Sequence, residues 1–505
     1  MLALLGADPL LHAEKNSANW NVVQLDRLLA SVPSGEKLVK VGDMGILVAH
    51  LRAWRNQLVG NSSDLAFDGG TPTWPGGILY YTFDDSVSAL HQKAFLDGAN
   101  EWAAFANLQF VARTTQPNYF TVIENPSLSG GFSAVGMVGG QQFLQIGPSS
   151  WNHGTVCHEL GHTLGLVHEQ QRSDRDSFVT ILTENIIPGT EDNFVKLGNS
   201  NNQGAYDFLS IMHYARNTLS IDSDLDTIEP LPAFSQFLDL MGHGDPILSP
   251  LDRAGMAAIY GNGPAFTSVV SNTRDSGPGS LRTAIYFGFD HPGTTITFNI
   301  PTSDAGFSNG VFNILPTDQL PGLWNATVID GGTEPTNSNP NGPEILLDGS
   351  LAQLPSVFAS GLHFRGTNCA ARSLIINLFS GYGILLDGTN TTGNAVSGCY
   401  LSVDSTGAVA MTNRLTSIAI EAGASGNVIG GTNAAARNVI SGSVSQGMFI
   451  RGVGTKNNSV QGNYIGLNAA GNAPLPNGFS GVGIFGGAQS NVIGGTVMGA
   501  GNIIS

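Results

Sequence analysis

Residues 158–169, His-Glu-Leu-Gly-His-Thr-Leu-Gly-Leu-Val-His-Glu, place three histidines within twelve positions. His158 and His162 are four residues apart, so on a helix both imidazoles project from one face and can bind one metal ion. Gly165 allows the chain to leave the helix, and the turn can bring His168 back as a third nitrogen ligand. Three imidazoles with one open position are typical of a catalytic zinc rather than a structural one.

Glu159 stands between the two helical histidines, and its side chain is expected at the flank of the metal-binding face. From there a carboxylate can reach a metal-bound water rather than the metal itself. We therefore predict one catalytic Zn²⁺ ion held by His158, His162 and His168, with Glu159 as the general base. The alternative interpretation is a helix with ordinary surface histidines, and a second motif weighs against it.

The longer pattern His-Glu-x-x-His-x-x-Gly-x-x-His resembles the signature of the metzincin peptidases. Ser210-Ile211-Met212-His213-Tyr214 is similar to the Met-turn that these enzymes place beneath the metal. Glu169 directly after the third histidine, together with Met-His-Tyr, makes the resemblance closest to the astacin family. It extends over about residues 70–262 and includes the stretches Trp74–Tyr81, Phe132–Gly136, Arg172–Asp176 and Leu248–Asp252.

The resemblance implies an α+β zinc endopeptidase that hydrolyses peptide bonds of proteins or peptides. In this mechanism a zinc-activated water attacks the scissile carbonyl, and Glu159 takes the proton of that water and delivers it to the departing amine. The resemblance also implies that Tyr214 binds zinc in the resting enzyme and supports the transition state; the alternative is a packed, hydrogen-bonded tyrosine. The substrate is expected to lie antiparallel to the edge strand near Phe132–Gly136.

Residues 1–66 lie where the family has a propeptide, and we expect helical stretches at 22–30 and 47–58 among turns. Family propeptides block the zinc with an aspartate in Phe-x-Gly-Asp. The nearest match here is Gly42-Asp43, with Lys40 where phenylalanine is expected. An aspartate in an ordinary turn is the simpler interpretation of Asp43, and Asp68 is a weaker second candidate.

Between this segment and the histidines the apolar spacing predicts strands and helices of a mixed α/β layer. We expect strands at 78–83, 108–113, 119–124 and 142–146, and helices at 87–105 and 155–166.

After residue 262 the composition changes. Val269–Arg282 resembles the opening segment of bacterial right-handed parallel β-helix proteins. Asn427-Val-Ile-Gly-Gly-Thr recurs at Asn491, an offset of 491 − 427 = 64 residues, which we interpret as about three coils of a solenoid. Inward isoleucine and valine would bury each coil against the next, with asparagine and glycine in tight turns. The chain stops inside a repeat, so we expect it to be incomplete at its carboxyl end, or capped there by a partner chain.

The predicted fold class is therefore multidomain. A propeptide-like segment (1–66) precedes an α+β metzincin/astacin-like zinc peptidase domain (67–262), and an all-β right-handed parallel β-helix solenoid follows (263–505).

The composition excludes some classes of protein. The chain has 505 residues, a net charge of −17 and a pI near 4.9, so nucleic-acid binding is not expected, because phosphate neutralisation needs clustered lysine and arginine. Only 12% of residues are charged and 66 are glycine, which is typical of turn-dense β structure. No run of about 18 apolar residues occurs, so a transmembrane helix is not predicted either.

The three cysteines do not define the compartment. Cys157 is predicted to be a small buried hydrophobic residue, while Cys369 and Cys399 could pair if stacked in neighbouring coils or remain as buried thiols. The apolar start Met1–Leu5 is too short for a signal peptide, so we expect the true start to lie upstream and the protein to be secreted or at the cell surface.

We thus predict a secreted zinc endopeptidase whose solenoid directs it to a surface or polymer, with a polysaccharide or cell-surface ligand as the second partner. The alternative is a β-helix adhesin, or a polysaccharide-binding or polysaccharide-acting protein, with a vestigial peptidase domain. The intact histidines, Glu159 and Tyr214 argue against decay of the site.

Overall fold

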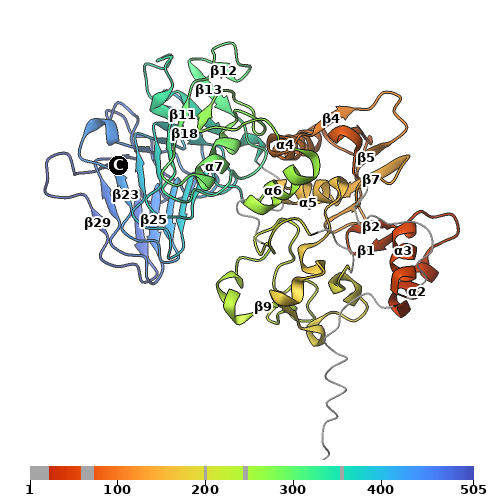
Figure 1. The fold of residues 1–505 in the computed structure, drawn as a ribbon. Coiled ribbons are helices and arrows are strands. Elements are labelled where there is room, and N and C mark those ends of the chain that lie inside the picture. The colour runs from red at the N-terminus through yellow and green to blue at the C-terminus, as the bar shows by residue number, and fades with distance from the viewer. Residues whose placement is uncertain (1–21, 59–72, 198–201, 243–247, 353–357) are drawn as a thin grey trace, which may run out of the picture. The chain divides into compact units, whose positions relative to one another are not determined.

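A computed structural model describes residues 22–58, 73–197, 202–242, 248–352 and 358–505 (Figure 1). The candidate Asp68 lies outside these residues. Contacts divide the chain into two compact units. Unit 1 comprises residues 1–88, 105–150 and 154–263, and unit 2 comprises residues 89–104, 151–153 and 264–505.

Unit 1 is built on a seven-stranded sheet with the order β1-β2-β6-β7-β5-β3-β4. Only the pairs β1–β2 and β6–β7 are antiparallel. The strands are β1 (Leu38–Val41), β2 (Met44–Leu47), β3 (Ile78–Phe83), β4 (Gln109–Ala112), β5 (Tyr119–Glu124), β6 (Gly131–Ala134) and β7 (Gln141–Ile146). The four strands predicted from apolar spacing are confirmed as β3, β4, β5 and β7, to within a few residues.

Two helices of unit 1 carry the motifs found in the sequence. The predicted metal helix is α5 (His153–Leu164), and α6 (Pro250–Tyr260) starts at the Leu-Ser-Pro-Leu-Asp stretch. Ser249 caps α6 through a capping box with Asp252, which fixes where the helix begins. The rest of the unit has the short pair β8 (Val179–Ile181) and β9 (Ile228–Pro230) and six 3₁₀ turns: η1 (Pro75–Gly77), η2 (Glu169–Gln171), η3 (Arg175–Ser177), η4 (Thr183–Asn185), η5 (Glu191–Phe194) and η6 (Pro232–Phe237).

The amino-terminal segment is folded as well. Helices α2 (Val22–Ser31) and α3 (Val48–Leu58) confirm the two predicted helical stretches, and the hairpin β1–β2 lies between them. Their buried apolar side chains share one cluster with Val135, Val195 and Leu197 from the peptidase-like region. The hairpin, which was not predicted from the sequence, therefore adds two strands to the sheet beside β6.

Unit 2 consists mainly of stacked coils whose strands form three sheets. Except for β12–β13, every pair of strands is parallel, and each of the five coils over residues 362–504 places one short strand in each sheet. The first sheet comprises β10 (Val269–Val270), β11 (Thr295–Phe298), β14 (Val328–Asp330), β17 (Ala370–Arg372), β20 (Ala395–Ser397), β23 (Val428–Gly430), β26 (Ser459–Gln461) and β29 (Val492–Ile493). The handedness of the winding stays a prediction.

The other two sheets follow the same plan. The second comprises β12 (Phe307–Ser308), β13 (Val311–Ile314), β15 (Ile345–Asp348), β18 (Leu374–Asn377), β21 (Tyr400–Leu401), β24 (Val439–Ile440), β27 (Tyr464–Ile465) and β30 (Ile503–Ile504). The third comprises β16 (Leu362–Phe364), β19 (Ile384–Asp387), β22 (Ile418–Glu421), β25 (Met448–Arg451) and β28 (Val482–Phe485). The 3₁₀ turns are η7 (Gly331–Thr333), η8 (Gly349–Leu351) and η9 (Ala434–Ala436).

The register corrects one interpretation of the sequence. Val428 pairs with Ser459, and Ser459 pairs with Val492, so the 64-residue repeat covers two coils and the prediction of three is wrong. The strands have only two to four residues, so most residues of a coil lie in turns. A coil is therefore longer in sequence than its strands alone would indicate.

Asparagine side chains tie successive coils together. Asn394, Asn427, Asn458 and Asn491 form a ladder in which each Nδ2 donates to the Oδ1 of the next residue, at 2.9–3.0 Å. The Oδ1 atoms of Asn427, Asn458 and Asn491 also accept the backbone N–H of the preceding asparagine. Asn438, Asn463 and Asn502 form a second ladder.

Cys369 and Cys399 remain as buried free thiols, as does Cys157 in unit 1, so the alternative of a disulfide is wrong.

Unit 2 also contains α4 (Ala89–Phe105), apart from its last residue, and α7 (Leu281–Asp290), linked by buried charges. Arg282 and Asp275 are both fully buried and form an ion pair of 2.7 Å. Thr317 Oγ1 donates to Asp275 and to Asp97 on α4. The Arg282 guanidinium is one reason why the pKa of Asp275 falls to about 2, although burial alone would raise it.

Within the described residues, no helix combines the length and the apolar character needed to cross a lipid bilayer.

Replacement of Asn427 by alanine should destabilise the coils. The change removes an acceptor that serves two N–H groups of Asn394 and leaves these donors buried, at a cost of about 3 kcal/mol in the free energy of unfolding. Guanidinium denaturation of the full chain would measure the loss. Asn390→Ala, at an exposed position, is the matched control, and an equal effect of both changes would contradict a ladder that supports the stack.

The Asp275–Arg282 pair should contribute to acid stability. Because the folded-state pKa of Asp275 is depressed to about 2, its contribution of about 2 kcal/mol is complete above the ordinary pKa near 3.8. It is lost as the pH falls from there toward 2. Asp275→Asn should lower the free energy of unfolding at pH 7 by about 3–5 kcal/mol, since Arg282 keeps a buried charge without its partner. The free energy of unfolding of this variant should also fall less steeply between pH 4 and 2 than that of the parent. Denaturation curves over this pH range would measure the difference.

Candidate metal centre

The sequence brings three imidazoles together at the end of α5. His158 and His162 share one face of the helix, which ends at Leu164, and Gly165 turns the chain with a φ of 111°. His168 follows in extended conformation before η2. The three ring centroids lie 4.7–5.3 Å apart, so the structure assembles the predicted histidine set.

The outer nitrogen of each ring has an oxygen partner. His158 Nδ1 lies 2.8 Å from the Ile211 carbonyl, and His162 Nδ1 lies 2.9 Å from the Leu166 carbonyl. His168 Nδ1 lies 3.2 Å from Gln171 Oε1. A carbonyl oxygen can only accept a hydrogen bond, so each Nδ1 keeps its proton and donates it to its partner. In a neutral imidazole the Nε2 then carries the lone pair, and the three Nε2 atoms converge on one centre.

The carboxylate of Asp43 lies against the same three nitrogens. Its oxygens are 3.2 Å from His158 Nε2, 3.6 Å from His162 Nε2 and 3.0 Å from His168 Nε2. Asp43 occupies the turn of the β1–β2 hairpin after Gly42, whose φ is 63°. It is thus a turn residue, as in the simpler interpretation, and it is also placed where a metal-blocking aspartate would lie.

This donor set fits a metal ion. Three imidazole lone pairs and a carboxylate converge with every ligand atom within 4.8 Å of the others. His162 Nε2 and Asp43 Oδ1 are buried and have no hydrogen-bond partner among the described residues. Such a group of acceptors repels itself unless a cation lies between them. Zn²⁺ suits three imidazoles and an oxygen, and His158, His162 and His168 would hold it.

Proton affinities at the centre reflect the same crowding. Burial alone would lower the pKa of His158, but the hydrogen bond and charge of Asp43 raise it to about 9. Burial lowers the pKa of His162 to about 4, against the pull of Asp43. The pKa of the Asp43 carboxyl lies well below its usual value, because the histidines outweigh its burial. The Asp43 carboxylate therefore stabilises positive charge at His158.

Glu159 lies beside the histidines with its carboxylate against β6. A Cβ atom at Gly131 would collide with the Glu159 carboxylate, so only glycine fits at this position of the strand. Burial raises the pKa of Glu159 well above its usual value, and its Oε2 has no hydrogen-bond partner among the described residues. A buried carboxylate with a raised pKa can accept and return a proton.

The turn at Ser210–Tyr214 is fixed beneath this group. Met212 Sδ would be 2.6 Å from a Cβ at Gly161, so the helix glycine allows the methionine to pack directly under α5. Asp252 holds the turn through Ser210 Oγ at 2.6 Å and the Ile211 N–H at 2.9 Å. The Ile211 carbonyl can then orient His158. Met212 is a packing residue at this place, as the resemblance implied.

Tyr214 packs on the three histidines. Its ring centroid is 4.5 Å from that of His168, and burial raises the pKa of its phenol. A Cβ at Gly42 would lie 3.2 Å from Tyr214 Oη, so the hairpin turn also touches this tyrosine. The structure thus brings Tyr214 to the predicted place, and its catalytic role stays a prediction.

Sequence reasoning missed several residues that shape the site. Gly131 and Gln171 lie outside the histidine motif, and their roles depend on contacts across the fold. Asp252 was found only as part of the Leu-Ser-Pro-Leu-Asp stretch. Its capping-box position was the available signal, because it fixes where that carboxylate lies.

Comparison with known proteins agrees with the site. Residues 68–261 match the family model of the astacin peptidases. Human Tolloid-like protein 1 is 42% identical over 161 residues, which are 31% of this chain and 16% of that protein. The Astacin-like metalloendopeptidase of Coturnix japonica is 33% identical over 238 residues, or 45% of this chain and 55% of that protein.

High choriolytic enzyme 1 of Oryzias latipes is 44% identical over 126 residues, or 25% of this chain and 46% of that protein. Its solved structure, described as a hatching enzyme zinc-protease, has 31% identity, covers 39% of this chain and 97% of that chain, and has a TM-score of 0.35. The chain spans from 16% to 55% of the length of these three curated relatives.

The fold and the match place this part of the chain among the zinc metalloendopeptidases. Residues 68–261 form an astacin peptidase domain.

The purified chain should contain one zinc ion per molecule. His162→Ala removes one of three converging nitrogens and should weaken zinc binding by at least about 100-fold. Metal analysis after dialysis against a chelator of graded strength would measure the change. His291→Ala, at an exposed histidine far along the chain, should retain zinc as the parent does.

Proposed function

We propose that the chain is a zinc endopeptidase that hydrolyses peptide bonds of protein substrates. The observation that carries this proposal is the convergence of three Nε2 atoms next to the buried Glu159 carboxylate, within an astacin domain. Zinc, when bound, supplies a Lewis acid for the scissile carbonyl and for the attacking water. His158, His162 and His168 are the proposed ligands.

Glu159 is the proposed general base and acid. Its carboxylate is buried and poised by its raised pKa to take a proton from the attacking water and to return it to the leaving amine. Gly131 leaves the space in which that carboxylate lies. Tyr214 is proposed to donate a hydrogen bond to the developing oxyanion, and its phenol stays protonated because burial raises its pKa.

We further propose that the uncut chain is latent. The hairpin places Asp43 on the histidines. Its second strand, β2, also pairs in parallel with β6 and occupies backbone hydrogen-bonding groups of that strand. The Ser133 N–H donates to the Asp43 carbonyl at 2.9 Å, and the Val135 N–H donates to the Gly45 carbonyl at 3.0 Å. These are the donors that an added substrate strand would need. Activity would then require that the hairpin leave β6.

The coils of unit 2 are proposed to direct the peptidase to its place of action, outside the cell or at its surface. A polysaccharide or cell-surface ligand is the partner this role requires. The stack supports the role because it presents turns and loops of many coils along one rigid body. The competing function, an adhesin with an inactive peptidase domain, would show binding without hydrolysis.

Peptide-bond hydrolysis should depend on Glu159 and on metal. Glu159→Gln keeps the shape of the side chain but cannot take a proton, so hydrolysis of unfolded casein should fall by at least about 1000-fold while zinc content stays equal to that of the parent. Chelation should abolish the parent's activity, and added zinc should restore it. Measurements are made after the amino-terminal segment is removed by limited proteolysis. A zinc-loaded, folded parent without activity would favour the adhesin.

Removal of the Asp43 carboxylate should activate the uncut chain. Asp43→Ala takes away the oxygens that lie 3.0–3.6 Å from the three Nε2 atoms, and casein hydrolysis should rise by at least about tenfold. Asp26→Asn is the matched control, because Asp26 lies in the same segment and pairs with Arg55 near the surface. Equal activity of both variants and the parent would contradict the latent state.

A further inference from the structure

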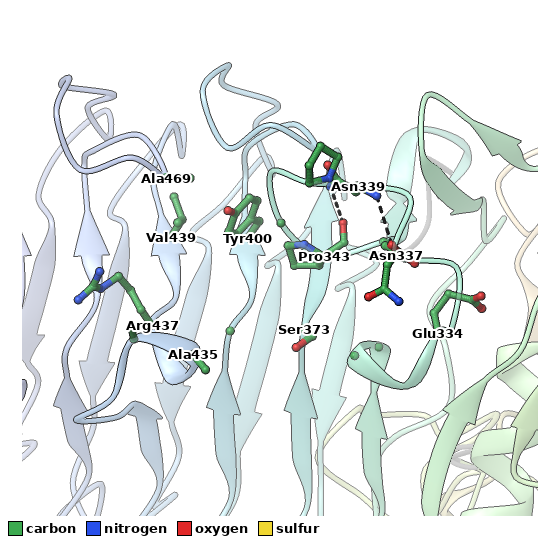
Figure 2. Close-up of a pocket in the computed structure, with 17 residues that line it drawn as sticks. Glu334, Asn337, Asn339, Pro343, Ser373, Tyr400, Ala435, Arg437, Val439 and Ala469 are labelled. Atoms are coloured by element: carbon green, nitrogen blue, oxygen red, sulfur yellow. Dashed lines mark hydrogen bonds between the residues drawn. The ribbon is translucent and has the colours of Figure 1, made fainter.

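A trough crosses the coils of unit 2 at the corner between its first and second sheets (Figure 2). It encloses about 510 Å³. Two long connections bound it, residues 331–344 between β14 and β15, and residues 431–438 between β23 and β24. The two coils between them turn with residue 373 alone and with residues 398–399. The walls lie three strand spacings apart in the first sheet, from β14 to β23, so the trough is roughly 14 Å wide along the stack.

The floor is kept low by small residues. Ser373 and Gly398 occupy the two short turns with φ values of 52° and 66°. A Cβ at Gly398 would lie within 3 Å of the Ala435 carbonyl, and a Cβ at Gly331 would collide with the Ser373 carbonyl. Larger residues there would have to displace backbone, so these turns preserve the hollow.

The first wall is held rigidly by its own charges. Glu344 accepts the Asn339 N–H at 3.2 Å and the Thr336 hydroxyl at 2.7 Å. Glu334 accepts the Ile300 N–H at 2.9 Å, and Figure 2 shows its carboxylate directed away from Ser373. Both side chains are buried and accept hydrogen bonds, so they stabilise the loop. A wall built before binding loses little entropy when a ligand arrives.

The opposite wall is held in the same way. The Arg437 guanidinium lies 4.2 Å from the Tyr464 ring centroid and donates to the Tyr464 hydroxyl at 3.0 Å. It also donates to the Gly462 carbonyl at 3.1 Å. Tyr400, between the walls, donates its hydroxyl to the Asn341 carbonyl at 2.5 Å and so ties the first wall to the floor.

The groups left to face a ligand are neutral. Figure 2 shows the Asn337 amide, the Ser373 side chain and the Tyr400 ring between the walls, with Pro343 and Ala435 beside them. The Asn337 Nδ2 donates one hydrogen bond to the Pro335 carbonyl at 3.1 Å, which leaves its second N–H and its Oδ1 for a ligand. The Ser373 hydroxyl can donate and accept, while the proline, alanine and tyrosine surfaces suit apolar faces of a ring. A polyanion would need several basic groups, whereas among the described residues Arg437 is the one basic residue that lines the trough, beside two carboxylates. An extended peptide would need an unpaired strand edge, whereas the strands at this corner are paired on both sides.

We propose that this trough binds a neutral oligosaccharide, whose hydroxyl groups bond to Asn337 and Ser373 and whose sugar rings pack on Tyr400 and Pro343. The assignment rests on the proposed targeting role of unit 2, and it involves no group of the zinc centre. It names the site and the class of ligand for that role.

The test uses the full chain and four soluble probes: cellohexaose, xylohexaose and chitohexaose as neutral saccharides, and hexagalacturonate as the anionic one. Saturation-transfer NMR detects binding, and calorimetry gives the dissociation constant. At least one neutral probe should bind. Ala435→Trp, which fills the trough from an exposed position, should weaken that binding by at least about tenfold. Asn337→Gly, which keeps the left-handed turn but removes the amide, should weaken it about threefold or more.

Val453→Trp is the matched control, since Val453 is 86% exposed in the turn after the third sheet, and it should bind as the parent does. Casein hydrolysis, measured on the same samples, should be equal in all variants, so a failed peptidase and a failed trough give different results. The proposal is overturned if no neutral probe binds the folded parent, if both trough variants bind as the parent does, or if only hexagalacturonate binds.

Discussion

Three hydrogen bonds to the outer nitrogens of His158, His162 and His168 determine what this chain can do. The carbonyls of Ile211 and Leu166 and the amide of Gln171 come from three different segments, and together they direct three Nε2 lone pairs to one point. Without these partners the histidines would lose their fixed orientation, and metal affinity would fall by about 10–100-fold. Several contacts keep the Ile211 carbonyl in place. Asp252, from the capping box of α6, holds the Met-turn, and Gly161 leaves room for Met212 under α5.

We propose that the amino-terminal segment keeps this centre latent. A cluster of lone pairs open to solvent would bind metal and substrate at once, whereas Asp43 and strand β2 cover the nitrogens and the edge strand together. One hairpin thus provides both the carboxylate that lies on the nitrogens and the strand that pairs with β6. Unit 2 is stabilised differently, by repeated asparagine ladders and by buried ion pairs such as Asp275–Arg282. Its stability depends on these contacts together with one continuous apolar core that runs through the coils.

Local patterns in the sequence were sufficient for α5 and for strands β3, β5 and β7, because helical spacing and apolar alternation are properties of short segments. The histidine set was predictable for the same reason. The β1–β2 hairpin was not, since its partner β6 lies about ninety residues away and only the sheet makes the pairing visible. The role of Gly131 was not predictable either, because the space it leaves is needed by the Glu159 carboxylate, which comes from a distant part of the sequence. The repeat of 64 residues was found, but very short strands concealed that it holds two coils.

X-ray absorption spectroscopy of the zinc-loaded, uncut chain tests the account most directly, because it counts the atoms around the metal. The account predicts a first shell of nitrogen and oxygen only, with outer-shell scattering from three imidazole rings and one oxygen contributed by Asp43, which Asp43→Ala should replace or remove. A spectrum with fewer than three imidazoles, or with a sulfur neighbour such as Cys157, would contradict it.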